Sequence, residues 1–176
     1  ENKPSFTVHP IGNWGSAEFG GEEKKLVMSS AILLKNLFTE LNKIARESQY
    51  ELTLEATHHG PYLEKPSVFV EIGSTETEWN DKLNGEIIAK MIMNGLSNAN
   101  ENYKCCIVLG GSHYNQAANK LMLKTNYAVG HICPKYALEH LNEQIFMQAI
   151  NTIIPKPEII LVDWKGLGKN KEKIIN

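Results

Sequence analysis

Two predicted turns in the sequence carry histidine side chains. His58 and His59 begin a His-His-Gly-Pro sequence, and His113 ends a Gly-Gly-Ser-His sequence. Histidine titrates near neutral pH, so it can activate a water molecule and then protonate a leaving hydroxyl, and its neutral ring can bind zinc. The residues therefore predict hydrolysis of an ester, with a metal-dependent and a metal-free route both open. The alternative for each turn is a loop whose imidazoles face solvent.

Glu71 and His9 are further candidates. Glu71 interrupts the apolar run Val-Phe-Val-Glu-Ile. A carboxylate at such a position either belongs to a functional site or lies on an edge strand and faces water, and we favour the functional-site interpretation. His9 lies beside a proline and a glycine-rich stretch, and it could complete a metal-binding set. His131 is interpreted as a buried core histidine and His140 as a surface residue of a helix.

Strand-like and helix-like patterns alternate along most of the chain. The expected strands cover residues 51–57, 67–73, 103–109, 127–133 and 158–164. The expected helices cover residues 26–50, 75–93, 114–123 and 136–151. Residues 1–23 contain prolines and several glycines, which predicts an irregular segment that wraps a surface and does not build a core.

This alternation predicts an α/β fold of three layers, with a mainly parallel sheet and helices on both faces. Ligands of such sheets bind beyond the carboxyl ends of the strands, because the loops converge there. We therefore expect His58, His59, His113 and Asp163, each at a strand end, to gather at one rim.

Length and composition narrow the class of protein. A chain of 176 residues predicts one domain, residues 1–176. No apolar stretch approaches the roughly 20 residues needed to cross a bilayer. Three cysteines without metal-type spacing predict reduced thiols and a cytoplasmic protein.

The formal net charge of −2 argues against a strongly basic nucleic-acid binder. Any RNA contact must be local, at Lys24-Lys25 or in the lysine-rich tail 165–173, where solvated surface lysines are the simpler interpretation. The sequence has no P-loop, no Gly-x-Gly-x-x-Gly after a strand and no Gly-x-Ser-x-Gly, which argues against kinases, dehydrogenases and serine hydrolases.

Several motifs, in order, carry a family resemblance. Leu-Glu-Ala-Thr-His-His-Gly-Pro at 54–61, followed by Phe-Val-Glu-Ile-Gly-Ser at 69–74 and Glu-Trp at 78–79, resembles the archaeal and plant type of D-aminoacyl-tRNA deacylase. Further matching motifs extend the resemblance over nearly the whole chain, at 5–10, 12–13, 110–114, 130–133 and 162–166.

The resemblance implies an esterase that uses zinc to cleave the bond between a D-amino acid and the tRNA 3′ end. It implies a fold similar to those of peptidyl-tRNA hydrolase and nucleoside phosphorylases, and D-aminoacyl-tRNA as the partner. We also expect a monomer without membrane contact. The expected catalytic residues are His58, His59, Glu71 and His113. The expected zinc ligands are His9, His58 and His113. The expected substrate contacts are Gly60, Pro61 and backbone N–H groups near Gly110 and Gly111.

The resemblance also has one departure, because family members are longer. We expect the chain to lack an N-terminal segment and the end of its last helix. Two alternatives stay open: a metal-free esterase similar to peptidyl-tRNA hydrolase, and a non-catalytic module that binds the tRNA end by stacking bases on histidines and on Trp14 or Trp79.

Overall fold

The computed structural model describes residues 3–73, 75–98 and 102–175. The strands are β1 (Ser5–Pro10), β2 (Ser29–Ser30), β3 (Glu51–Leu54), β4 (Val68–Gly73), β5 (Lys104–Leu109), β6 (Tyr127–Cys133), β7 (Ile153–Ile154) and β8 (Ile159–Val162). The helices are α1 (Ala31–Ile44), α2 (Glu76–Asn80), α3 (Lys82–Ser97), α4 (Gln116–Lys124), α5 (Glu143–Thr152) and α6 (Lys171–Ile175), with short 3-10 helices η1 (Leu138–His140) and η2 (Gly168–Asn170).

Strands β6, β5 and β8 form a parallel sheet in that order. Leu109, the last residue of β5, pairs with both Cys133 and Val162, so the three strands end in register. A second sheet has the order β3-β1-β4, in which β1 is parallel to β3 and antiparallel to β4. The sheet content is therefore mainly parallel, and β4 is the antiparallel exception.

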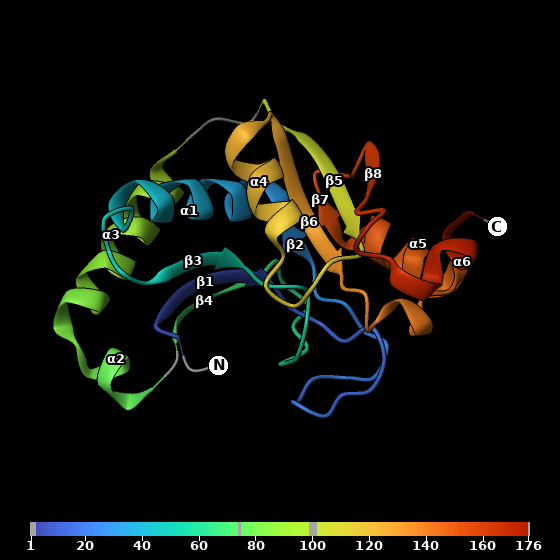
Figure 1. Cartoon of the computed structure of the whole chain (residues 1–176), viewed down its shortest axis with the longest axis horizontal. Coiled ribbons are helices and arrows are strands. Elements are labelled where there is room, and N and C mark those ends of the chain that lie inside the picture. The colour runs from blue at the N-terminus through green and yellow to red at the C-terminus, as the bar shows by residue number, and fades with distance from the viewer. Residues whose placement is uncertain (1–2, 74, 99–101, 176) are drawn as a thin grey trace.

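The side chains of β5 alternate between two cores. Cys106 and Val108 belong to a core built with α1, α3, α4 and the second sheet, whereas Cys105, Ile107 and Leu109 belong to a core built with α5. Figure 1 shows α1 above β1, β3 and β4 with α3 beside it at the left, and α5 and α6 at the right, beyond β7 and β8. Helices therefore cover both faces, and the predicted three-layer α/β fold is confirmed.

The prediction of an irregular segment over residues 1–23 is wrong at its start. Strand β1 is buried along its whole length and pairs with both β3 and β4. Phe6 and Val8 alternate with Thr7 and His9, which is the period of a strand, and Pro10 can end a strand because the last residue need not donate. The glycines that follow obscured this pattern.

Two predicted helix boundaries are also wrong, for reasons of capping. Helix α1 was expected to begin at residue 26, but it begins after Ser30, whose hydroxyl accepts a hydrogen bond from the Leu33 amide. The residues just before it form β2. The predicted helix 75–93 is divided at Asp81, which is extended and caps α3 by accepting from the Leu83 amide. The three cysteines are buried and unpaired, as predicted. Among the described helices, none has the length and apolar character that crossing a membrane requires.

Candidate active site

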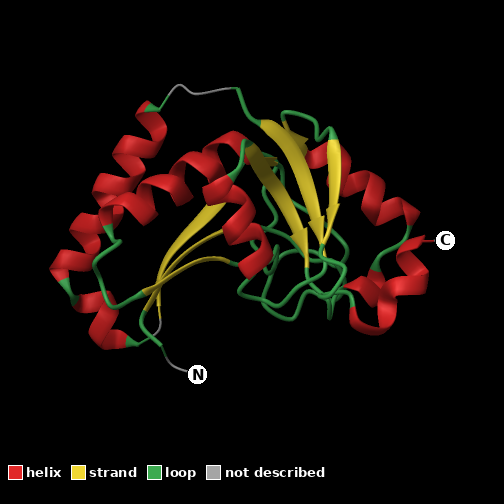
Figure 2. Ribbon diagram, turned by 45° about the horizontal axis from the view of Figure 1, so that its top comes forward, coloured by secondary structure: helices red, strands yellow, loops and turns green. Residues whose placement is uncertain are grey.

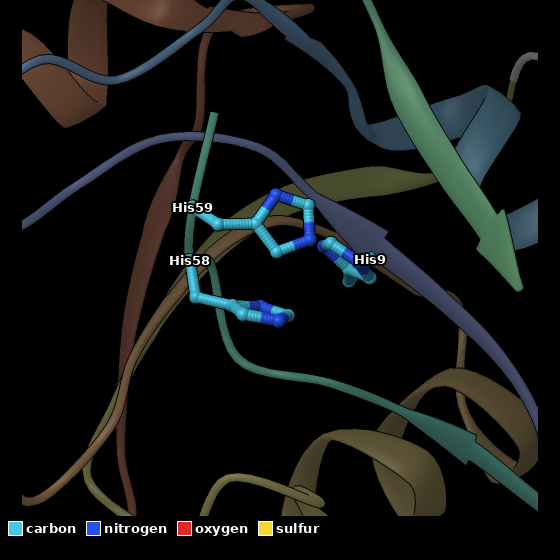
Figure 3. Close-up of side chains that lie close together, drawn as sticks. All are labelled: His9, His58 and His59. Atoms are coloured by element: carbon cyan, nitrogen blue, oxygen red, sulfur yellow. The ribbon is translucent and has the colours of Figure 1, made fainter. Parts of the chain in front are cut away.

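Four histidines from three parts of the chain lie together at the seam between the two main sheets. His9 comes from β1, His58 and His59 follow β3, and His113 follows β5. The ring centroid of His58 lies 4.2 Å from that of His9, 4.4 Å from that of His59 and 4.5 Å from that of His113. Figure 3 shows the rings of His9, His58 and His59 converging on one point. The predicted gathering of these histidines is present, and the strand β1 contributes one of them.

Three of the rings are oriented by backbone carbonyls. The Nδ1 atoms of His9, His58 and His59 hydrogen-bond to nearby carbonyl oxygens, those of Pro10 at 3.0 Å, Ala56 at 2.8 Å and Gly60 at 2.5 Å. A carbonyl oxygen can only accept, so in each ring Nδ1 carries the hydrogen. In a neutral imidazole, Nε2 then presents a lone pair to the centre of the cluster.

His113 follows the same pattern with a side-chain partner. Its Nδ1 lies 3.0 Å from the hydroxyl of Tyr136, and its Nε2 lies 2.9 Å from Oε2 of Glu55. All four histidines therefore hold Nδ1 outside the cluster and turn Nε2 toward it.

Glu55 is the buried carboxylate of the cluster, with 5% of its surface exposed. Its Oε2 also lies 3.3 Å from Nε2 of His58. Burial raises the pKa of this carboxyl, but the hydrogen bond with His113 and the charge of His9 outweigh burial and lower the pKa to about 2. Sequence reasoning missed Glu55 because it was the polar position of an alternating strand. Its place directly after Leu54, the last residue of β3, was the available signal.

Glu71, expected to be a site residue, supplies the second carboxylate from β4. The register pairs Glu71 with Thr7 of β1, and its Oε1 lies 3.4 Å from Nε2 of His9 and 3.7 Å from Nε2 of His59. The hydrogen bond with His9 lowers the pKa of Glu71 against an opposing effect of burial. Its side chain is 37% exposed, so it lies at the solvent edge of the cluster.

The protonation of His58 is also perturbed. Burial, with the nearby charge of His9, lowers its pKa to about 4. His58 is therefore neutral at neutral pH, and a neutral ring is the form that binds metals.

The cluster contains three sets of donor atoms that could hold a metal ion. In each set the atoms lie within 4.8 Å of one another. The sets are His9, His58 and His59; Glu55, His58 and His113; and His9, Glu55 and Glu71. Imidazole nitrogen and carboxylate oxygen are ligands that suit zinc. The predicted trio of His9, His58 and His113 is not one of these sets, because His113 is grouped with Glu55.

A cavity of about 500 Å³ opens on the histidine side of the cluster. His58, His59 and His113 line it together with Phe19 and Tyr136. A second cavity of about 470 Å³ lies on the carboxylate side, where Glu55 and Glu71 are joined by Trp79 and Tyr114. The cluster is therefore accessible from both sides.

Gly60 is held against a loop of the N-terminal segment. A Cβ at this position would lie 2.1 Å from the backbone nitrogen of Gly21, so only glycine fits. His59 has a φ of 44°, in the left-handed region. The His-His-Gly-Pro turn is thus fixed by direct contact with the glycine-rich loop, and Pro61 is exposed beside it.

Gly110 and Gly111 do not supply free amides to the site. The Gly110 amide donates to the Cys133 carbonyl and the Gly111 amide donates to the Gly166 carbonyl. The expectation that these N–H groups hold a substrate carbonyl is therefore corrected. Asp163 likewise lies outside the histidine cluster and accepts a hydrogen bond from the Gly166 amide.

Three other aromatic or histidine residues have clear positions. His131 is fully buried and lies 3.2 Å from hydroxyls of Thr57 and Thr152, which confirms the core interpretation. His140 has a side chain that is 43% exposed, at the surface as predicted. Trp14 is buried at the inner wall of the histidine-side cavity and donates to the Ile132 carbonyl.

Comparisons with known proteins identify the family of the chain. The family model described as D-aminoacyl-tRNA deacylase matches residues 1–176. A D-aminoacyl-tRNA deacylase of Ignicoccus hospitalis is 41% identical over 93% of this chain and 66% of its own length. One of Archaeoglobus fulgidus is 35% identical over 100% of this chain and 63% of its own length.

A solved structure supports the fold. The crystal structure of a conserved protein of unknown function superposes with a TM-score of 0.92 and 35% identity, over 99% of this chain and 62% of that one. The chain thus spans a little under two thirds of the length of these three relatives. Because the family model covers every residue and the two deacylases share the family name, the chain belongs to the D-aminoacyl-tRNA deacylase family.

Proposed function

We propose that this chain carries the active site of a zinc-assisted hydrolase that cleaves the ester between a D-amino acid and the 3′ end of tRNA. The names of the relatives support the reaction class and the substrate. The four-histidine, two-carboxylate cluster supports the use of a metal.

One observation carries the metal proposal. The Nδ1 atoms of His9, His58 and His59 are bound to carbonyl oxygens, so each ring turns Nε2 toward the carboxylates Glu55 and Glu71. An Nε2 that carries no hydrogen repels the facing carboxylate oxygen unless a cation lies between them. A low pKa disfavours protonation of His58, which favours the cation.

The outer contacts of the histidines also fit metal binding. Histidines that bind metals commonly hold their other ring nitrogen with a carbonyl or carboxylate, which fixes the ring and its tautomer. Here His9, His58 and His59 have backbone carbonyls in that role, and His113 has the Tyr136 hydroxyl. We propose either His9, His58 and His59 or Glu55, His58 and His113 as the ligand set, because Nε2 is the one free ring nitrogen of His58 and cannot serve both sets.

Bound zinc would supply a water of lowered pKa and would polarise the ester carbonyl. The protein residues supply the proton transfers and the positioning. Glu71 lies at the solvent edge of the cluster with a depressed pKa, so it is ionised and able to accept a proton from water. We assign to Glu71 the transfer of that proton toward the leaving hydroxyl of the terminal ribose.

A contact beside the histidine-side cavity gives a basis for selectivity. The loop containing Gly20 and Gly21 packs against Gly60, the neighbour of the cavity-lining His59, and leaves no space there for a further carbon atom. A side chain directed at this contact would collide with backbone, and backbone does not yield as a flexible side chain does. We propose that this contact excludes the L side chain and leaves the D side chain in the open cavity.

A metal-free acid–base route is the second candidate, and one observation favours it. His113 is hydrogen-bonded on one side to the Tyr136 hydroxyl and on the other to Glu55. A histidine held by a carboxylate in this way can act as a general base. Such a base would act without zinc.

The test of the reaction class is the release of free tyrosine from D-tyrosyl-tRNA and L-tyrosyl-tRNA by the protein. We expect release from the D substrate at a rate at least about 100-fold above that from the L substrate, because a backbone clash costs several kcal/mol. Equal release from both would contradict the assignment of selectivity to the contact at Gly60. No release from either, with binding of the charged tRNA retained, would replace the hydrolase by a module that binds the tRNA end.

A further inference from the structure

A groove distinct from the two cavities of the candidate site begins beside His113, beyond the carboxyl ends of β5, β6 and β8. It encloses about 710 Å³ and is lined by Lys135, Lys165 and Lys169, all exposed. Lys135 follows β6 and Lys165 follows β8, and these strands end in register with β5. Figure 2 shows the three parallel strands ending at one set of loops. The topology therefore places lysines on both sides of the loop that carries His113.

The groove is built by backbone contacts. The Gly111 amide donates to the Gly166 carbonyl, and the Gly111 carbonyl accepts from the Lys135 amide, which ties together the loops after all three strands. The side chain of Lys135 packs over Gly168, where a Cβ would lie 2.4 Å from Cε of the lysine. These contacts fix the three loops relative to one another and place the Lys135 side chain against Gly168.

The lysines of the groove are not ion-paired within the described part of the chain. None of the ammonium groups of Lys135, Lys165 and Lys169 forms an ion pair with a carboxylate of the described residues. Two carboxylates also line the groove, and both have local partners. Asp163 accepts from the Gly166 amide, and Glu139 lies 3.8 Å from Nε2 of His140. The groove therefore has three ammonium groups without an ion pair against two carboxylates, and its lysines are available to an anion from outside the chain.

The groove is continuous with the active-site cavity. His113, Tyr136 and Glu139 line both. His113 in turn contacts Glu55 at the centre of the cluster. A chain whose terminal ester lies at the cluster can extend past Tyr136 into the groove, where the next groups along that chain meet the lysines.

We propose that the lysine groove, formed by Lys135, Lys165 and Lys169, binds the phosphodiester backbone of the single-stranded 3′ end of the RNA substrate. The inference rests on the proposed function, because the ester at the cluster identifies the polymer that continues from it. Phosphates bound by lysines release counterions, which gives an affinity that depends on salt. With a net charge of −2, the protein has to concentrate such contacts locally, and this groove does so at the correct end of the site.

The test compares RNA binding by charge-removing variants. The lysine-groove variant carries Lys135→Gln, Lys165→Gln and Lys169→Gln, which keep part of each side-chain stem. The control carries Lys82→Gln, Lys90→Gln and Lys104→Gln, exposed positions on α3 and at the amino end of β5 that change the net charge equally. The probe is a single-stranded RNA with the sequence of a tRNA 3′ end, a fluorophore at its 5′ end and a free 3′ hydroxyl.

The expected result is a loss of affinity confined to the lysine-groove variant. Its Kd should rise about tenfold or more, and the slope of log Kd against log salt should fall by about 2, since each phosphate contact to a single strand contributes about 0.7. The control variant should match the unchanged protein. Equal binding and equal slopes in all three proteins would overturn the inference, as would equally tight binding of a polyglutamate of the same charge.

Hydrolysis of D-tyrosyl-tRNA separates this inference from the proposed function. If the lysine-groove variant loses RNA affinity while the unchanged protein shows no hydrolysis, RNA binding by the groove is supported and the proposed hydrolysis is contradicted. If the unchanged protein hydrolyses the substrate and the lysine-groove variant keeps its affinity and its KM, the hydrolysis is supported and RNA binding by the groove is contradicted.

Discussion

Oε2 of Glu55 lies 2.9 Å from Nε2 of His113 and joins the ends of β3 and β5. The backbone reinforces this link, because the Ala56 amide donates to the His113 carbonyl at 2.8 Å. Strand β3 belongs to one sheet and β5 to the other. The candidate active site is therefore built at the seam between the sheets, and its geometry depends on their packing.

Glu55→Gln tests the buried carboxylate. Glutamine keeps the shape of the side chain but removes the charge that faces His58 and His113, so we expect kcat/KM for D-tyrosyl-tRNA to fall by about 100-fold or more. Zinc content, measured by mass spectrometry after dialysis, should fall with it. Glu47→Gln, at an exposed position, is the matched control. Unchanged zinc content and activity in Glu55→Gln would remove this residue from the site.

Tyr136→Phe tests the orientation of His113. Without the hydroxyl, Nδ1 of His113 loses the partner that lies 3.0 Å away and the ring is free to turn. We expect kcat to fall by about 10- to 100-fold, as for other outer contacts of catalytic histidines, with little change in thermal stability because Tyr136 is 56% exposed. A loss confined to KM would show instead that the hydroxyl contacts substrate.

The parts of the site that sequence could predict were those with an unusual local composition. The His-His-Gly-Pro and Gly-Gly-Ser-His turns end strands, and the rule for parallel sheets brought their histidines together. Glu55 was hidden because a polar residue in an alternating strand normally faces water, and its burial depends on the second sheet. The role of β1 was hidden by the glycines after Pro10, since the pairing of this strand with β3 and β4 is a long-range contact.

Gly60→Ala tests the contact between the turn and the glycine-rich loop. The added Cβ would lie 2.1 Å from the Gly21 nitrogen, so the loop must move. We expect the free energy of unfolding to fall by about 1–3 kcal/mol, as in other overpacked sites, and D-over-L selectivity to weaken. The control is Gly85→Ala in α3, where a Cβ meets nothing within 4 Å. It should stabilise the protein by up to about 1 kcal/mol through helix propensity. Chemical denaturation of the two variants measures both effects.

His131 predicts a pH dependence of stability. Burial lowers its pKa to about 3 in the folded protein, whereas the unfolded chain takes up a proton below about 6.5. The stability contributed by the neutral ring is therefore complete above about pH 6.5 and is lost as the pH falls toward 3. Between pH 7 and pH 5 this residue should cost about 2 kcal/mol.

His131→Gln isolates that contribution, because glutamine does not titrate. Its free energy of unfolding should be lower at pH 7, with a smaller decrease between pH 7 and pH 5 than in the unchanged protein. Urea unfolding at the two pH values measures the difference. Parallel decreases in both proteins would show that His131 does not govern the acid sensitivity.

The central claim is that the cluster of four Nε2 atoms and two carboxylates binds the zinc used in hydrolysis. The dependence of hydrolysis on zinc tests this claim most directly. The measurement is the release of tyrosine from D-tyrosyl-tRNA by the protein before chelation, after removal of the chelator and its metal, and after addition of zinc. Our account predicts that chelation stops release and that zinc restores it. Release that continues at the same rate in the metal-free protein would contradict the account and would assign the reaction to acid–base catalysis by His113 and Glu55.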